Sequence, residues 1–282
     1  MLKIRSIKKM QLLLEVARQE KKRIGFVPTM GSLHEGHQSL LRKSKKDNDL
    51  SILSIFVNPK QFFANEDFAL YPRDEKKDEI LAKKEKVDII LYPSIKEMYP
   101  DGYKTYVDVE QLSNVLCGES RSGHFRGVAT VVAKLLNIVC PDKLYLGQKD
   151  AQQAVIIKQM VNDLNFPSKI EVMPTVREND GLAMSSRNSY LSMKHREEVP
   201  VLFKSLKLAK YKILKGETSA GQIIRQIRSN ITQNTSGRID YIECVNAETL
   251  QPLRTLTGRV LIAVAVWFGR ARLIDNIILR IR

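Results

Sequence analysis

Short apolar runs alternate with longer amphipathic stretches over the first two thirds of the chain. Residues 24–28 form an apolar run that predicts a buried strand, and residues 36–46 show polar and apolar positions at helical spacing. Residues 50–57 form a second apolar run, which ends at Asn58-Pro59. A strand, a helix and a strand within roughly 30 residues predict a βαβ unit with parallel strands.

The same alternation continues to about residue 180. Apolar residues recur at helical spacing between positions 127 and 139, which predicts a helix that packs on the sheet. These residues are Val128, Val131, Val132, Leu135, Leu136 and Val139. The other predicted elements are helices at 74–86 and 151–164 and strands at 87–92, 143–146 and 170–176. Strands that alternate with helices predict an α/β fold, with a parallel sheet covered on both faces.

The pattern changes after residue 180. Residues 194–215 and 219–234 predict two helices, and three β-rich runs follow at 239–247, 259–268 and 271–279. Gly269-Arg270 separates the last two runs and predicts a hairpin. We therefore expect a smaller α+β C-terminal domain. The polar loop at 177–188 sets the boundary, which gives domains at 1–180 and 181–282.

Composition narrows the class of protein. Of the 282 residues, 43% are hydrophobic and 27% charged, the balance of a soluble globular protein. No apolar run approaches the roughly 20 residues of a membrane helix, and the N-terminus lacks the pattern of a secretory signal. The three cysteines are far apart, which argues against a disulfide framework and suits a reducing compartment. We expect a cytoplasmic protein without a membrane partner.

The formal net charge of +15 leaves three kinds of partner open: nucleic acid, an anionic membrane or a phosphorylated small molecule. Lysines are spread over predicted helices and are mixed with acidic residues, which favours a solvated basic surface. An RNA-binding module remains a rival class. No RNP-like, KH or arginine-rich stretch supports it, so we expect no nucleic-acid partner.

A loop with two histidines lies between the first strand and its helix. Gly31 and Gly36 allow close approach of a ligand to the backbone, and the helix N-terminus favours an anion. His34 and His37, three residues apart, add donors on one helix face that could stabilise charge during phosphoryl or nucleotidyl transfer. Helix capping and a zinc pair are alternatives; only His124 and His195 could add a histidine ligand.

Two further loops carry anion-binding chemistry. Gly147 permits close approach, Lys149 supplies a positive charge, and Asp150 can accept from a hydroxyl or cap a helix. The stretch Ala183-Met-Ser-Ser-Arg187 offers two hydroxyls and a guanidinium. A tight turn and an interdomain linker are the plain alternatives. Together, the three loops predict an adenylate-forming or nucleotidyl-transfer enzyme. The glycine spacing matches neither a Rossmann fingerprint nor a P-loop.

Six motifs resemble one family. They are PTMGSLHEGH, VNPKQF, YPRD, SGHFRGVATVV, LGQKDAQQ and PTVRENDGLAMSSRN, in the order and spacing of the pantoate–β-alanine ligase (pantothenate synthetase) family. HEGH and MSSR also resemble the HIGH and KMSKS signatures of class I aminoacyl-tRNA synthetases. The resemblance implies a Rossmann-like nucleotidyltransferase domain, a C-terminal lid and a homodimer. It also implies condensation of (R)-pantoate with β-alanine through pantoyl adenylate, with release of AMP and pyrophosphate.

The resemblance assigns roles to residues of this chain. It makes His37, His34, Lys149 and Arg187 catalytic. It places Gln61 at pantoate and β-alanine, and Gln153 at pantoate. The implied ATP-binding residues are Met30, Gly31, Ser32, Leu33, His34, Glu35, Gly36, His37, Gly147, Gln148, Lys149, Asp150, Val176, Met184, Ser185, Ser186 and Arg187. No metal is expected on the protein itself, and Mg²⁺ should be carried by the ATP phosphates.

The chain departs from the family pattern at two places. The family usually has G-E-K-D followed by an aromatic residue. This chain has Gln148 in place of the glutamate and Ala151 in place of the aromatic residue. Phe63-Ala64 replaces a frequent Gly-Pro. The alternative function is a related transferase that adenylylates a phosphorylated small molecule and releases a dinucleotide. That function would give no reason for paired glutamines at 61 and 153.

Overall fold

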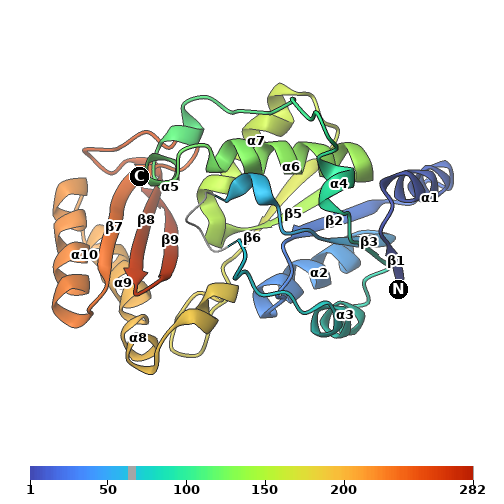
Figure 1. The fold of residues 1–282 in the computed structure, drawn as a ribbon. Helices are drawn as coiled ribbons and strands as arrows, with labels where there is room; N and C mark the ends of the chain where they lie inside the picture. The colour runs from blue at the N-terminus through green and yellow to red at the C-terminus, as the bar shows by residue number, and fades with distance from the viewer. Residues whose placement is uncertain (63–67, 282) are drawn as a thin grey trace.

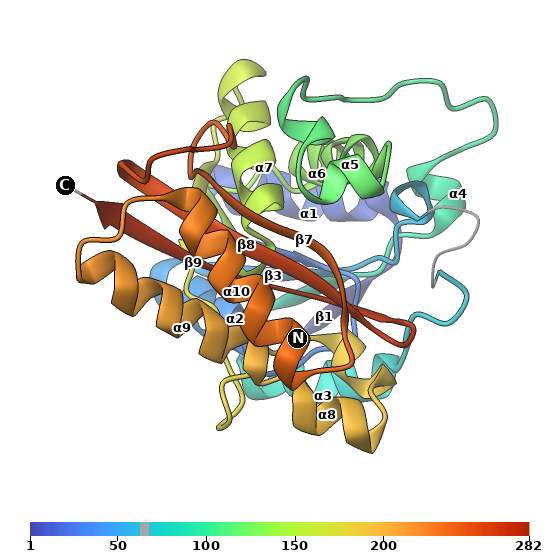
Figure 2. The ribbon, with the colours of Figure 1, turned by 90° about the vertical axis from the view of Figure 1, so that its left-hand side faces the viewer.

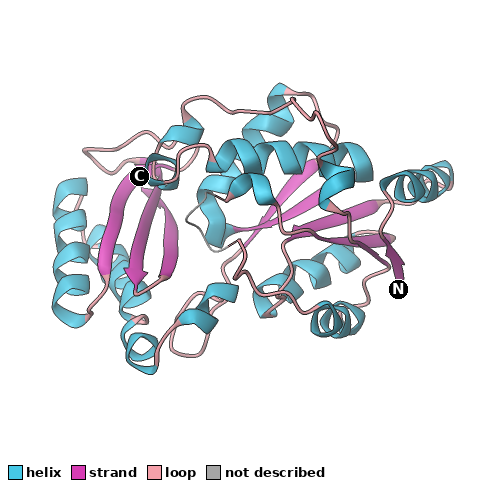
Figure 3. Cartoon of the chain, in the orientation of Figure 1, coloured by secondary structure: helices cyan, strands magenta, loops and turns pink. Residues whose placement is uncertain are grey.

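The computed structural model describes residues 1–62 and 68–281 and contains two separate sheets (Figures 1 and 3). The first has six strands in the order β1-β4-β3-β2-β5-β6, and every pairing in it is parallel. The second has three antiparallel strands in the order β7-β8-β9. The predicted fold class is confirmed.

Helices cover both faces of the first sheet, as the alternation predicted. Phe26 and Ile52 face a core shared with α1, α6 and α7, whereas Val27 and Leu53 face α2 and α3. This is the period of two that a strand buried on both faces requires. The elements are β1 (Leu2–Ile4), α1 (Ile7–Gln19), β2 (Ile24–Thr29), α2 (Glu35–Asp47), β3 (Leu50–Ile55), α3 (Glu75–Lys84), β4 (Ile89–Leu91), α6 (His124–Val139), β5 (Lys143–Gly147), α7 (Ala151–Asp163) and β6 (Lys169–Met173).

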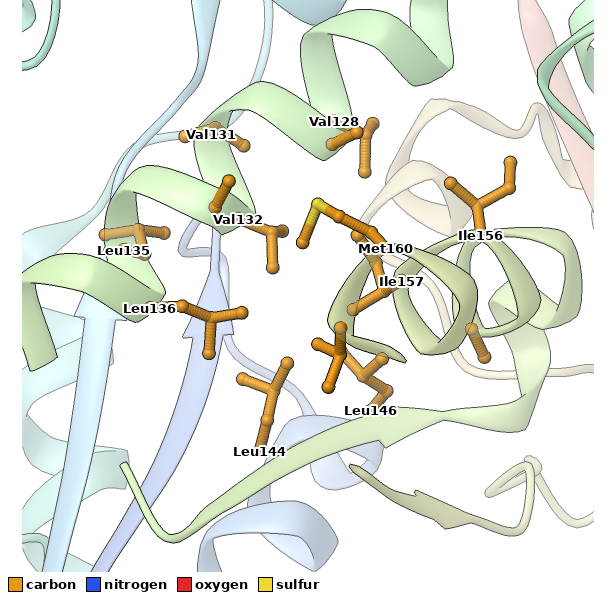
Figure 4. Close-up of a cluster of buried hydrophobic side chains, with 14 of the residues drawn as sticks. Val128, Val131, Val132, Leu135, Leu136, Leu144, Leu146, Ile156, Ile157 and Met160 are labelled. Carbon is orange, nitrogen blue, oxygen red and sulfur yellow. The ribbon is translucent and has the colours of Figure 1, made fainter. Parts of the chain in front are cut away.

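Helix α6 forms the centre of the larger core. All six apolar residues predicted at helical spacing are buried. Figure 4 shows five of them, all but Val139, beside Leu144 and Leu146 of β5 and Ile157 and Met160 of α7. Burial of each such side chain contributes about 1.5–3 kcal/mol relative to exposure. This packing fixes the N-terminus of α6 beside the carboxyl ends of the strands.

The C-terminal part is a helix pair on a three-stranded sheet. Helices α9 (Val201–Leu214) and α10 (Ala220–Asn234) lie side by side on one face of β7 (Arg238–Asn246), β8 (Gly258–Phe268) and β9 (Ala271–Ile281) (Figure 2). The opposite face of β7 and β8 joins the core of the first sheet. The predicted hairpin at Gly269-Arg270 is confirmed, and the division of the chain at residue 180 stays a prediction.

Several expectations need correction. The predicted helix at 194–215 is two helices, α8 (Met193–Glu198) and α9, interrupted at Val199-Pro200, because proline has no N–H to continue the ladder. The strand predicted to reach residue 176 ends at Met173, before Pro174. The prediction missed β1, α1, α4 (Ile95–Met98), α5 (Cys117–Ser120) and 3-10 helices at Pro59–Gln61, Leu112–Asn114, Gln148–Asp150 and Ser186–Tyr190. The departure at Phe63-Ala64 lies outside the described residues.

Candidate active site

A cavity of about 540 Å³ lies between the two sheets, where the carboxyl ends of the parallel strands meet the C-terminal sheet. Ligands of open α/β sheets bind at this edge. The predicted residues that line it are Met30, His34, Gly36, His37, Gln61, Gly147, Lys149, Asp150, Gln153, Val176, Met184, Ser185, Ser186 and Arg187. Gly31, Ser32, Leu33, Glu35 and Gln148 are not among the lining residues.

The histidine pair is held by the backbone that begins α2. His34 is the N-cap, and its Nδ1 accepts from the N–H of Gly36 at 3.1 Å. Nδ1 of His37 accepts from the N–H of His34 at 3.4 Å, and the two ring centres are 4.1 Å apart. A backbone N–H only donates, so each neutral ring carries its proton on Nε2. The capping interpretation is therefore correct, and it also sets the tautomer that the site offers.

Both histidines are neutral at pH 7. Burial lowers the pKa of His34 to about 4, with the Lys149 charge as a second cause. Burial also lowers the pKa of His37 well below its ordinary value, and His34 and Lys149 add to this effect. Neutral imidazoles with Nε2–H groups are hydrogen-bond donors, which suits stabilisation of an anionic group.

A carboxylate of α3 holds the backbone of the first loop at residues 32 and 33. Asp78, 1% exposed, accepts from the N–H groups of Ser32 at 2.9 Å and Leu33 at 2.7 Å. Gly31 and Ser32 have φ of 83° and 52°, in the left-handed region. A Cβ on Gly31 would lie 2.8 Å from Asp78, so this turn requires glycine. The side chain of Glu35 pairs with Arg42 at 2.6 Å.

The second loop follows β5. A Cβ built on Gly147 meets no atom within 4 Å, so its backbone has open space around it. Lys149 and Asp150 line the cavity, and their charged groups are 3.5 Å apart. Gln148 turns the other way, and its amide donates to Oδ1 of Asn276 at 3.4 Å. The departure from the family pattern at residue 148 thus faces β9.

The third loop contacts the segment that contains Tyr71, and both line the cavity. Ser185 caps the short helix Ser186–Tyr190, and the hydroxyl of Ser186 is 3.2 Å from that of Tyr71. The Arg187 guanidinium lies 5.9 Å from the Tyr71 ring centre. The N–H of Met184 donates to the carbonyl of Val176. The Ser-Ser-Arg stretch is therefore an ordered wall of the cavity.

Gln61 is held by residues that sequence reasoning did not assign. Its Oε1 accepts from Asn58 at 3.1 Å, and its carbonyl accepts from Nδ1 of His124 at 2.8 Å. Nε2 of His124 accepts from Arg121 at 3.1 Å, so both ring nitrogens have partners only when the ring is neutral. Burial, followed by the Arg121 charge, lowers the pKa of His124 to about 3. Gln153 lies in the first turn of α7 and lines the same cavity.

The cavity has further polar residues from distant segments. Arg272 of β9 pairs with Asp240 at 2.7 Å and donates to the sulfur of Cys117 at 3.3 Å, and the Tyr241 hydroxyl is 3.2 Å from that sulfur. The motif that contains His124 was visible in the sequence, but its contact with Gln61 was not. No local pattern marks Tyr241 or Arg272.

Within residues 1–62 and 68–281, no group of three or more His, Cys, Asp or Glu side chains is arranged to hold a metal ion. Over the same residues, no helix is long and apolar enough to cross a membrane.

The parallel sheet and the loops at its carboxyl edge define an α/β protein with a cavity lined by two histidines, Lys149 and Arg187. The sequence profile described as pantoate-beta-alanine ligase matches residues 3–278. The chain belongs to this family. A pantothenate synthetase from Caldicellulosiruptor saccharolyticus is 53% identical over 281 residues, which cover 100% of each chain to the nearest per cent. One from Acetivibrio thermocellus is 56% identical over 258 residues, 92% of each chain.

Solved structures agree. Pantothenate synthetase from Thermus thermophilus has a TM-score of 0.93 at 40% identity, covering 98% of this chain and 99% of that one. Pantoate-beta-alanine ligase from Francisella tularensis, complexed with beta-gamma ATP and beta-alanine, has a TM-score of 0.77 at 36% identity, covering 98% and 97%.

Proposed function

We infer that this chain is an ATP-dependent ligase that condenses (R)-pantoate with β-alanine to pantothenate through pantoyl adenylate, releasing AMP and pyrophosphate. Family membership over residues 3–278 carries the conclusion. The relatives spanning nearly the whole chain are pantothenate synthetases. The cavity, which collects the neutral histidines, Lys149 and the Ser-Ser-Arg loop, supplies donors for a triphosphate.

The first step joins pantoate to the nucleotide. A carboxylate oxygen of pantoate attacks the α-phosphorus of ATP, and the bond to the bridging oxygen of pyrophosphate breaks. Negative charge grows on the α-phosphate and on the leaving pyrophosphate. We assign its stabilisation to Nε2–H of His34 and His37, the Lys149 ammonium and the Arg187 guanidinium. We assign the remainder of ATP to Gly147, Lys149, Asp150, Val176 and residues 184–187, which line the cavity.

The second step forms the amide. The amine of β-alanine attacks the acyl carbon of pantoyl adenylate, AMP leaves, and the amine loses a proton. We assign pantoate to Gln61 and Gln153 and the approach of β-alanine to Gln61. Gln61 is only 9% exposed and is fixed by Asn58, so its amide is preorganised. A neutral amide leaves the pantoate carboxylate nucleophilic, whereas a lysine would pair with it.

The proposal has four further parts: the metal, the oligomeric state, the location in the cell and the domain boundary. We expect Mg²⁺ to be carried by ATP phosphates and water, as small hard cations usually are, so excess chelator should abolish activity.

We expect a homodimer, which sedimentation velocity tests. The three cysteines are free, which suits the reducing cytoplasm, and cell fractionation tests that location. We expect domains at 1–180 and 181–282, and separate expression of the two segments tests whether each folds alone.

The product decides the function. Purified protein with pantoate, β-alanine, ATP and Mg²⁺ should form pantothenate and AMP in equal amounts, with each substrate required. ADP as the nucleotide product would indicate an acyl phosphate and overturn the adenylate route. A dinucleotide formed from a phosphorylated small molecule would favour the related transferase.

A further inference from the structure

Strand β9 reaches from the C-terminal sheet to the loop that carries Lys149. Asn276, 3% exposed, donates through Nδ2 to the carbonyls of Gln148 at 3.0 Å and Lys149 at 2.9 Å. Its Oδ1 accepts from the side chain of Gln148 at 3.4 Å. Both N–H groups and the oxygen of this buried amide are therefore used by one loop.

The residue before it in β9 holds the third loop. Asp275, 4% exposed, accepts two hydrogen bonds from Arg177, at 2.7 and 2.9 Å. Arg177 lies between β6 and the Ser-Ser-Arg stretch, donates to the carbonyl of Gly181, and places its guanidinium 3.6 Å from the ring centre of Phe203. Two consecutive residues of β9 thus fasten two loops of the cavity.

The strand is a firmer support than the loop it holds. β9 pairs with β8 along its whole length, and Asn276 lies opposite Ala263 in the middle of that ladder. Residues 148–150 form only a short 3-10 helix, and Gly147 has open space around it. A functional loop needs such outside support to hold its charged group to within a fraction of an ångström.

We propose that Asn276 is a positioning residue for the nucleotide: its amide fixes the backbone at Gln148 and Lys149 and so places the Lys149 ammonium in the cavity. The inference rests on the proposed function, because it assigns Lys149 to the ATP phosphates. It also gives the C-terminal sheet a part in ATP use through Lys149, since the group that sets the loop belongs to β9.

Asn276→Asp tests this at nearly constant volume. The carboxylate has no N–H for the two loop carbonyls and repels them, so the loop must move. Asn276 also lines the cavity, so the added charge acts on the ATP phosphates as well. Uncharged Asn276→Ala must therefore raise the KM for ATP too if the residue acts by positioning. In Asn276→Asp we expect the KM for ATP to rise at least tenfold, while the KM for pantoate stays within threefold. Asn230→Asp is the matched control. It makes the same change at a C-terminal asparagine that donates to Ser205 at 2.7 Å and is not among the residues lining the cavity. It should leave both KM values unchanged.

A second measurement, the pKa of His34, reports on the position of the Lys149 charge. Its charge is one cause of the lowered pKa of His34, beside burial, while Asp150 acts in the opposite direction. In Asn276→Ala the ammonium is no longer held, so the pKa of His34 should rise above about 4 by the Lys149 contribution alone, because burial, the larger cause, is unchanged; NMR of the ring carbons follows this shift. A residue that merely fills space would lower thermal stability without this shift.

The outcomes separate clearly. Folded Asn276→Asp with a KM for ATP within twofold of the parent, or with equal losses for ATP and pantoate, overturns the proposal. If Asn276→Asp does not fold, Asn276→Ser, which keeps one donor, takes its place with a smaller expected rise of about threefold, and parental values there overturn it equally. Calorimetric binding of a non-hydrolysable ATP analogue tests the inference even if the parent chain forms no pantothenate.

Discussion

His124 should make the stability of this protein fall as the pH is lowered below neutrality. Its ring donates to the carbonyl of Gln61 and accepts from Arg121, an arrangement that only the neutral ring satisfies. Burial and the Arg121 charge lower its pKa to about 3 in the folded protein. In the unfolded chain the ring titrates at about 6.5, so the unfolded state takes up the proton first and gains stability as pH falls.

The size of the effect follows from the two pKa values. The contribution of His124 is complete above about pH 6.5 and is lost progressively down to about pH 3. Each pH unit within that window costs about 1.4 kcal/mol. Between pH 7 and pH 5 the loss is therefore about 2 kcal/mol, a large share of the roughly 5–15 kcal/mol that stabilises a typical domain.

Urea unfolding at pH 7, 6 and 5 and constant ionic strength measures this. His124→Gln, which does not titrate, should reduce the difference in unfolding free energy between pH 7 and pH 5 by about 2 kcal/mol. Val139→Ala removes a buried methyl pair from the far end of α6 and keeps His124, so it should lower stability at every pH and preserve the slope. An unchanged slope in His124→Gln would refute the reasoning.

Three further predictions concern the proposed chemistry. His37→Ala should slow adenylate formation roughly 10²-fold while far-UV circular dichroism stays unchanged; a parental rate would confine His37 to capping. Gln148→Glu should change kcat by less than about tenfold, because residue 148 faces β9, whereas Lys149→Ala should cost much more; steady-state rates at saturating substrates decide. Gln61→Ala and Gln153→Ala should each weaken pantoate use by about 1–3 kcal/mol; a loss in ATP affinity instead would contradict both assignments.

Elements fixed by local sequence were predictable, and those fixed by distant partners were not. Helix α2 was expected at 36–46 and is found at Glu35–Asp47, because its amphipathic pattern and loop are contiguous. β1 is a three-residue strand that gains its order from pairing with β4, where Leu2 faces Ile89. The signal for α1 was present in the spacing of Met10, Leu14 and Ala17, all buried in the structure.

The residues of the site show the same difference between local motifs and distant partners. The histidine, Gly-Gln-Lys-Asp and Ser-Ser-Arg loops were visible because each is a continuous motif at a strand end. His124 and Asn276 were not assigned, because their partners lie 63 and 127–128 residues away in sequence. The types of the predicted residues were readable, but the charge and tautomer of His34 were not, since they depend on its burial and on which backbone N–H meets Nδ1.

His34 combines capping with chemistry, and one substitution separates the two. Its Nδ1 caps α2, which leaves Nε2–H for the cavity. Asparagine is among the best N-cap residues, so His34→Asn should keep the free energy of unfolding within about 1 kcal/mol of the parent. It removes the Nε2–H donor, and adenylate formation should fall roughly 10²-fold in a single-turnover assay of pyrophosphate release. His34→Ala loses the cap as well, so it should be slow and also less stable by about 1 kcal/mol. A parental rate in stable His34→Asn would show that the ring acts only on the helix, and the stabilisation of the α-phosphate would then have to come from His37, Lys149 and Arg187.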